Sequence, residues 1–163
     1  MTDTKPLYQY LNACTISVQS RLSSRKKLLQ EMARLLSFSL LDEAVEEQEE
    51  TVEKAVYHAL LEREKLGNTG IGDGIAIPHS RFENAHEAIV AIIVLAEAVD
   101  YDSPDHQPVK IAFGLLVPQS ASAEHLKILS CIARMMSEPS KREELSAATS
   151  AEHAIEIIQT WEN

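Results

Sequence analysis

The feature that most constrains the fold is an apolar run, AIVAIIVLA, at residues 88–96. A membrane-spanning helix needs roughly 20 apolar residues, so this run is too short to cross a bilayer. It has the length of a strand, and it is apolar at odd and even positions alike, which is typical of a strand buried on both faces. The run therefore predicts the central strand of a covered sheet.

The elements around this run indicate the fold class. Helical spacing of apolar residues predicts helices over about residues 25–37, where Ser23 or Ser24 can act as the N-cap, and over about residues 42–65. Residues 14–19 and 109–118 have strand character, and helices follow from residue 122. Helices, then strands, then helices predict an α/β chain with a mixed sheet flanked by helices, and 163 residues suit a single domain spanning residues 1–163.

Charge and composition limit the classes of partner and the cellular location that we expect. A net charge of −10 argues against nucleic-acid binding, which requires clustered Lys and Arg, and favours protein partners with basic surfaces. The N-terminal residues lack the basic and apolar blocks of a signal peptide, so we expect a cytoplasmic protein. Cys14 and Cys131 are too few and too far apart to predict a disulfide framework.

The segment NTGIGDGIAIPHSR, residues 68–81, first suggests a phosphate-binding loop because it holds Gly70, Gly72 and Gly74. Nucleotide loops run from a strand through glycines into a helix, and here the order is helix, glycines, strand. The glycines therefore predict a backbone role, either turns with positive φ or the close approach of another chain.

His79 is the next candidate functional residue, because it follows Pro78 at the end of the expected strand. A regular strand would place His79 on the face of Ile75 and Ile77, toward the core, but proline cannot donate to a ladder and makes regular continuation doubtful. From spacing alone, a partly buried histidine at a turn and a firmly held, exposed, reactive histidine both remain open.

Three segments carry a family resemblance: LEREKLGNTGIGDGIAIPHSR at residues 61–81, VKIAFGLLVP at 109–118 and AEHLKILSCIARMM at 123–136. Together they resemble the IIA phosphocarrier proteins of the bacterial phosphoenolpyruvate-dependent phosphotransferase system, of the fructose and mannitol type. Within that type the chain is most similar to the nitrogen-regulatory IIA proteins. The resemblance implies a mixed sheet sandwiched by helices, and phosphorylation of His79 on its tele nitrogen, Nε2.

The resemblance also implies roles for other residues. Arg63 matches an arginine near the phosphohistidine, and His125 matches a second active-site histidine. Ser80 stands where family members commonly have glycine, so its hydroxyl is a candidate donor to a phosphoryl oxygen. Arg81 is a second candidate contact, with binding of a partner as its alternative. The implied donor is the small phosphocarrier HPr or its nitrogen-branch relative, NPr.

Physical chemistry fits these assignments. Imidazole is a nucleophile that is neutral near pH 7 and forms a labile phosphoryl bond. With Ser122 as N-cap, His125 would be about the third residue of its helix, where the dipole disfavours an imidazolium, although spacing alone also fits a surface residue. Arg63, Arg81 and amides of the glycine turns are candidates to balance phosphoryl charge. No motif predicts a metal site or a cofactor.

The sequence thus predicts a phosphotransferase component, a phosphohistidine carrier that regulates target proteins by its phosphorylation state. Potassium transport and sensor proteins are candidate targets. One alternative is a sugar-specific IIA protein that passes phosphate to a IIB domain. The other is a binding module on the same fold, in which His79 is not phosphorylated.

Overall fold

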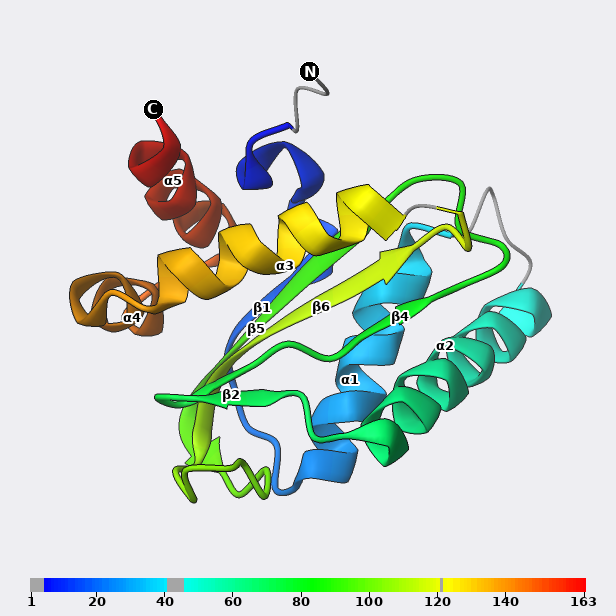
Figure 1. The fold of residues 1–163 in the computed structure, drawn as a ribbon, viewed down its shortest axis with the longest axis horizontal. Helices are drawn as coiled ribbons and strands as arrows, with labels where there is room; N and C mark the ends of the chain where they lie inside the picture. Colours follow the sequence, from blue (N-terminus) through cyan, green and yellow to red (C-terminus); the bar gives the residue numbers. More distant parts are fainter. Residues whose placement is uncertain (1–4, 41–45, 121) are drawn as a thin grey trace.

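The computed structural model describes residues 5–40, 46–120 and 122–163, apart from the side chains of residues 46–49 and 122. The chain forms a mixed six-stranded sheet with helices on both faces (Figure 1). Its elements are η1 (Leu7–Tyr10), η2 (Ala13–Thr15), β1 (Ile16–Ser20), α1 (Arg25–Phe38), α2 (Glu46–Leu66), β2 (Gly70–Gly72), β3 (Ile75–Ala76), β4 (His79–Arg81), β5 (Ile89–Val99), β6 (Val109–Val117), α3 (Ser122–Met136), α4 (Pro139–Ser146) and α5 (Ala151–Glu162).

The strand order is β1-β5-β6-β3-β2, and β4 pairs with β6 beyond the end of β3. β1 runs parallel to β5, β5 antiparallel to β6, and both β3 and β4 parallel to β6. The predicted mixed sheet flanked by helices is confirmed.

β5 is central, between β1 and β6, as its apolar run predicts. Val90, Ile92 and Val94 pack into the cluster on one face of the sheet. The residues between them, including Ala91 and Ile93, pack into the cluster on the other face. Because both faces are covered, the strand shows no alternation of apolar and polar residues.

The two faces carry different helices (Figure 1). Buried residues of η1, α3, α4 and α5 share the first cluster, and those of α1 and α2 share the second. None of the helices in the described residues is long and apolar enough to cross a membrane.

α1 packs closely against the sheet. Ser24 caps it by accepting a hydrogen bond from the Lys27 amide at 3.1 Å. Met32 lies directly over Gly114 of β6, where a Cβ would overlap the Met32 sulfur. The glycine at position 114 therefore suits the close approach of the helix rather than a turn.

α2 begins at Glu46, and residues 42–45 of the expected helix lie outside the described residues. Val56 and Leu60 are fully buried against the second cluster, and Glu64 occupies the next position of the same stripe. The helix ends at Leu66, with Arg63 and Lys65 in its last turn. That turn forms one wall of the candidate site.

Candidate functional site

His79 lies in a strand that resumes after an interruption. β3 ends at Ala76, and β4 begins at His79, so Pro78 separates two short strands that both pair with β6. The Pro78 carbonyl still accepts from the Leu115 amide at 3.0 Å. The sequence predicted that Pro78 would end the strand. It does interrupt the ladder, but three residues pair again, so His79 is held in a strand rather than just beyond one.

The hydrogen bond of His79 fixes its tautomer. Nδ1 lies 2.6 Å from the Ile77 carbonyl oxygen, and a carbonyl can only accept, so Nδ1 carries the proton. In the neutral ring Nε2 then has the free lone pair. Burial lowers the pKa of His79, the Ile77 carbonyl opposes this shift, and the Arg63 charge adds to it. A neutral imidazole with a nucleophilic Nε2 is the expected state at pH 7.

His125 lies beside His79. The ring centroids are 5.1 Å apart and the rings meet edge to face, at 87°. Burial lowers the pKa of His125, and the charges of His79, Arg81 and Arg63 lower it further. α3 begins at Ser122, so His125 is the fourth helical residue rather than the third, and the residue before Ser122 lies outside the described residues. The first turn of α3 brings a second neutral imidazole to His79.

Arg63 approaches from α2. Its Nη1 donates to the Gly67 carbonyl at 2.8 Å, and the Gly67 amide donates to the Glu64 carbonyl at 3.1 Å. Gly67 is not among the residues with positive φ. The end of α2 is therefore closed by the arginine side chain rather than by a left-handed glycine.

A hollow of about 480 Å³ brings the five predicted residues together. It lies where the edge strand β4 meets the last turn of α2 and the first turn of α3. Its lining residues are Ala59, Glu62, Arg63, Leu66, His79, Ser80, Arg81 and His125. Two cations and two neutral imidazoles around one hollow can orient and neutralise a phosphoryl group.

Ser80 and Arg81 point to different sides of β4. Ser80 aligns with Leu116, on the face of α1 and α2, whereas His79 and Arg81 align with Leu115 and Val117, on the face of α3. The Ser80 hydroxyl donates to the Arg81 carbonyl at 2.9 Å. Its proton is therefore already used, and a contact with a phosphoryl group would require the hydroxyl to rotate.

The three glycines of residues 70–74 shape the backbone away from the His79 hollow. Gly72 and Gly74 have φ of 92° and 80°, and a Cβ on Gly70 would overlap Ser103. The predicted turns with positive φ thus occur at Gly72 and Gly74, and Gly70 lies against another segment of the same chain. None of the three lines the His79 hollow, and the Asp73 amide between them donates to Asp105 at 2.9 Å. The prediction that amides of these turns contact the phosphoryl group is not supported.

Sequence reasoning missed Glu64. Its carboxylate is 3% exposed and forms an ion pair with Arg25. It also accepts from the Thr69 amide at 3.1 Å, the Thr69 hydroxyl, and the Tyr101 hydroxyl at 2.7 Å. Burial and the neighbouring Glu64 charge raise the pKa of Tyr101. The position of Glu64 on the buried stripe, four residues after Leu60, is the sequence signal that identifies it as a buried acid.

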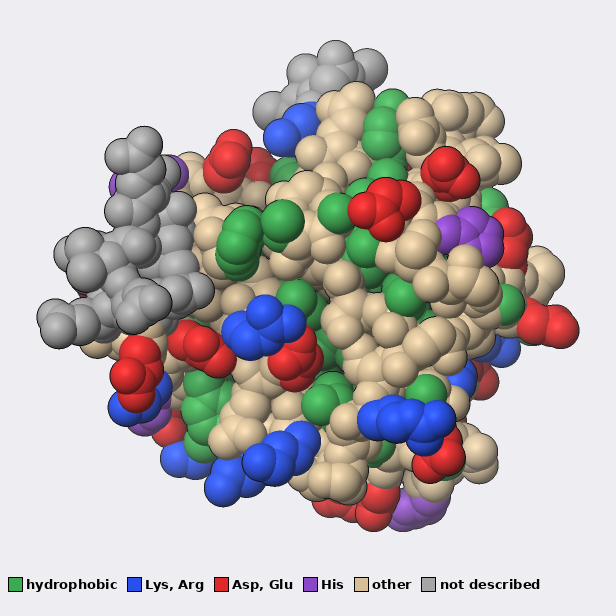
Figure 2. Space-filling model, turned by 180° about the vertical axis from the view of Figure 1, so that it is seen from behind, with side chains coloured by type: hydrophobic (Ala, Val, Ile, Leu, Met, Phe, Trp, Pro, Cys, Tyr) green, Lys and Arg blue, Asp and Glu red, His purple; other side chains and the backbone are tan. Residues whose placement is uncertain are grey.

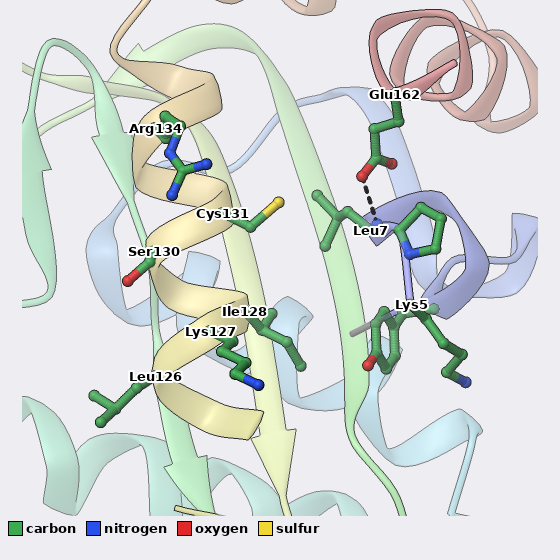
Figure 3. Close-up of a pocket in the computed structure, with 11 residues that line it drawn as sticks. Lys5, Leu7, Leu126, Lys127, Ile128, Ser130, Cys131, Arg134 and Glu162 are labelled. Atoms are coloured by element: carbon green, nitrogen blue, oxygen red, sulfur yellow. Dashed lines mark hydrogen bonds between the residues drawn. The ribbon is translucent and has the colours of Figure 1, made fainter. Parts of the chain in front are cut away.

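Another hollow, of about 520 Å³, lies between α3 and the N-terminal segment (Figure 3). Cys131 and Ile128 point into it, and Glu162 accepts from the Leu7 amide at 2.7 Å. Burial raises the pKa of the Cys131 thiol, which makes it a weak nucleophile. None of the predicted site residues lines this hollow. Within the described residues no group of three or more His, Cys, Asp or Glu could hold a metal ion.

Comparison with known proteins places these features in a family. Residues 9–161 match the family described as "Phosphoenolpyruvate-dependent sugar phosphotransferase system, EIIA 2". The chain is 37% identical to a nitrogen regulatory protein of Pseudomonas aeruginosa over 140 residues, which cover 86% of each protein. It is also 37% identical to the fructose-specific EIIA component of Haloferax volcanii over 119 residues, 73% of this chain and 77% of that protein.

A solved structure shows the same fold. The nitrogen regulatory protein IIA-Ntr from Neisseria meningitidis superimposes with a TM-score of 0.82 at 36% sequence identity, covering 93% of this chain and 98% of that one.

Proposed function

Since this chain belongs to the EIIA 2 family of the phosphoenolpyruvate-dependent phosphotransferase system, we propose that it is a phosphohistidine carrier in which Nε2 of His79 accepts the phosphoryl group. The observation that carries the proposal is the hydrogen bond from Nδ1 of His79 to the Ile77 carbonyl. This bond leaves Nε2 as the nucleophile, in a hollow that it shares with His125 and Arg63. The proposal treats residues 1–163 as one IIA domain, in line with the extent of the family match.

The transfer step follows from this tautomer. The Nε2 lone pair attacks phosphorus, the bond from phosphorus to the donor histidine breaks, and its electron pair returns to the donor nitrogen. Phosphorylated His79 then holds its proton on Nδ1, where the Ile77 carbonyl stabilises the positive charge of the ring. In this proposal Arg63 and a neutral His125, which line the same hollow, donate to the phosphoryl oxygens.

The donor we propose is an HPr-like phosphocarrier, either HPr or NPr. Transfer between two histidines requires the partner to dock directly over the hollow. Leu66 lines the hollow and is 85% exposed, and Leu126, next to His125, is 67% exposed. Leu66 and Leu126 thus add exposed apolar surface near His79, where the proposed partner would dock.

For the output of the carrier, we propose regulation of target proteins by phosphorylation state, because the Pseudomonas aeruginosa and Neisseria meningitidis relatives are nitrogen regulatory proteins. The second candidate is a sugar-specific IIA protein that passes phosphate to a IIB domain. It is favoured by the 37% identity to the fructose-specific component of Haloferax volcanii.

The test is phosphorylation with enzyme I, the phosphocarrier and phosphoenolpyruvate. We expect an acid-labile, alkali-stable phosphoprotein, the stability pattern of a phosphohistidine. His79→Ala should abolish labelling, and His58→Ala, which changes an exposed histidine of α2, should label like wild type. An unlabelled wild-type chain would favour the binding-module alternative, and equal labelling of His79→Ala would refute the assignment of the site.

A further inference from the structure

A third hollow, of about 640 Å³, lies between the beginning of α1 and the end of α2. α1 contributes Arg25, Lys26 and Leu29, and α2 contributes Tyr57, Leu61, Glu64 and Lys65. These α2 residues alternate along the helix with those that line the His79 hollow. The last turn of α2 therefore separates the third hollow from the His79 hollow. The volume falls in the range typical of small-molecule sites, which combine apolar walls with a few polar groups.

The walls of this hollow are apolar. Leu29 lines the hollow but is buried, whereas Tyr57 and Leu61 are half-buried and offer carbon surface from different turns of α2. A flat or branched apolar group placed between them would be removed from water at about 25 cal/mol per Å² of buried area.

Cations surround these apolar walls. Glu64 neutralises Arg25 in the ion pair described above, whereas Lys26 is exposed and forms no ion pair with any described residue. Lys65 pairs with Glu62 at 2.8 Å, but its side chain is largely exposed, and such pairs contribute little. The hollow therefore offers donors and positive charge in excess of its one carboxylate.

Helix stability does not explain the position of Lys26. The first turn of α1 contains no acidic residue, and cations at a helix N-terminus oppose the dipole by about 0.3–1 kcal/mol each. The chain as a whole carries a net charge of −10. Figure 2 nevertheless shows Lys and Arg side chains gathered at the lower left of this face, at the end of the molecule where α1 begins and α2 ends.

We propose that this hollow binds a small organic acid, with its apolar body against Leu29, Tyr57 and Leu61 and its carboxylate between Lys26 and Lys65. Charge complementarity selects an anion, and the carbon surface selects one with an apolar body over a bare inorganic ion. This site goes beyond the proposed phosphocarrier function and does not rest on it, because binding is expected in the unphosphorylated chain.

The test is a titration of the full ¹⁵N-labelled chain with 3-phenylpropionate, followed by amide chemical shifts. We expect saturable shifts at residues of α1 and α2 that line the hollow, with a Kd on the order of millimolar for so small a probe. Acetate, which lacks the apolar body, and 3-phenylpropanol, which lacks the charge, should each bind at least fivefold more weakly.

Two neighbouring lysines provide the matched variants. Lys26→Gln should weaken binding of 3-phenylpropionate three- to tenfold, whereas Lys27→Gln, one position along α1 and outside the lining, should leave the Kd unchanged. Equal affinities of the two variants, equal binding of the alcohol, shifts that do not saturate, or shifts confined to the α3 hollow of Figure 3 would each overturn the proposal. Labelling of His79 is measured separately, so failure of this site leaves the phosphocarrier proposal standing.

Discussion

At the scale of single residues, the proposed chemistry depends on which nitrogen of His79 is protonated. The Ile77 carbonyl two residues earlier holds the proton on Nδ1. This bond is local in the sequence but depends on the break between β3 and β4 at Pro78, so the periodicity of apolar residues cannot predict it. His125 and Arg63 reach the same hollow from two helices on opposite faces of the sheet.

The first residue-scale prediction concerns His125. If its ring donates to the phosphoryl group, His125→Ala should reduce the initial rate of phosphoryl uptake by about 10²–10³. Its far-UV circular dichroism should stay unchanged, because His125 is only half-buried. A surface residue without this role would change the rate less than threefold.

The second prediction concerns pH. The pKa of His79 is lowered from the ordinary value of 6.5, so the folded chain disfavours the imidazolium. His79 therefore contributes stability that is present above pH 6.5 and is lost as the pH falls through the folded pKa. Phosphoryl uptake should likewise persist at pH 6.5 and decline only below it.

The pH prediction can be checked by the ring proton shifts of His79 followed against pH. Because His79 and His125 interact, the two rings should titrate as a pair, both with midpoints below 6.5. A His79 midpoint above 6.5 would contradict the burial argument. His58→Ala identifies the signals of an exposed histidine for comparison.

At the scale of elements, the geometry of the His79 hollow depends on how α1 and α2 are fixed to the sheet and to the glycine-containing segment that follows α2. Glu64 connects the last turn of α2 to Arg25 of α1, to Thr69 before β2 and to Tyr101 after β5. One buried carboxylate thus joins the end of α2 to the loop that follows it and to two segments that are distant in the sequence, at Arg25 and Tyr101. Arg63, the residue before it, owes its position to the same turn.

Replacing this carboxylate tests that role. Glu64→Gln should lower the free energy of unfolding by about 2–3 kcal/mol, because the guanidinium of Arg25 loses its counter-ion and the buried network loses an acceptor. The matched control is Glu62→Gln, which changes an exposed glutamate of the same turn and should not move the urea midpoint. Equal midpoints for the two variants would show that the network contributes little.

The packing of α1 on β6 gives another prediction. Gly114→Ala should destabilise the chain by about 1–3 kcal/mol, because the added methyl group overlaps the Met32 sulfur. Shortening the partner should relieve part of this overlap, so the double variant with Met32→Ala should be more stable than the sum of the two single changes predicts. Strict additivity in a double-mutant cycle would argue against direct contact.

How far the sequence predicts these elements depends on the range of the interactions. The run that is apolar at odd and even positions predicted β5 and the covered sheet. The capping serine and the apolar stripe predicted α1. Both signals are local in the sequence. The placement of Ser80, Glu64 and the Asp73 amide could not be predicted, since each depends on a partner or a pairing register set by the tertiary fold. The family resemblance, rather than spacing, brought His79, His125 and Arg63 into one site.

At the scale of the whole molecule, the two faces of the sheet share the same central strands. β5 and β6 supply buried residues to both clusters, so neither layer of helices can keep its core when these strands separate. Such sharing favours a single cooperative transition.

Cooperativity can be measured with Trp161, the only tryptophan, which packs against the first cluster. Its fluorescence should report the same urea midpoint as far-UV circular dichroism, to which α1 and α2 of the opposite face contribute. Two separate midpoints would contradict the proposal that residues 1–163 form one domain.

The last turn of α2 has a consequence for the molecule as a whole. One side of this turn presents Arg63 to the His79 hollow, and the other presents Glu64 and Lys65 to the hollow beside α1. Thermodynamic linkage makes any effect across such a shared wall reciprocal. If a phosphoryl group on His79 changes the affinity of the α1 hollow by some factor, occupancy of that hollow must shift the equilibrium of phosphoryl exchange by the same factor. In such a chain the phosphorylated fraction of His79 would depend both on the phosphorylation potential of the donor and on the concentration of the organic acid.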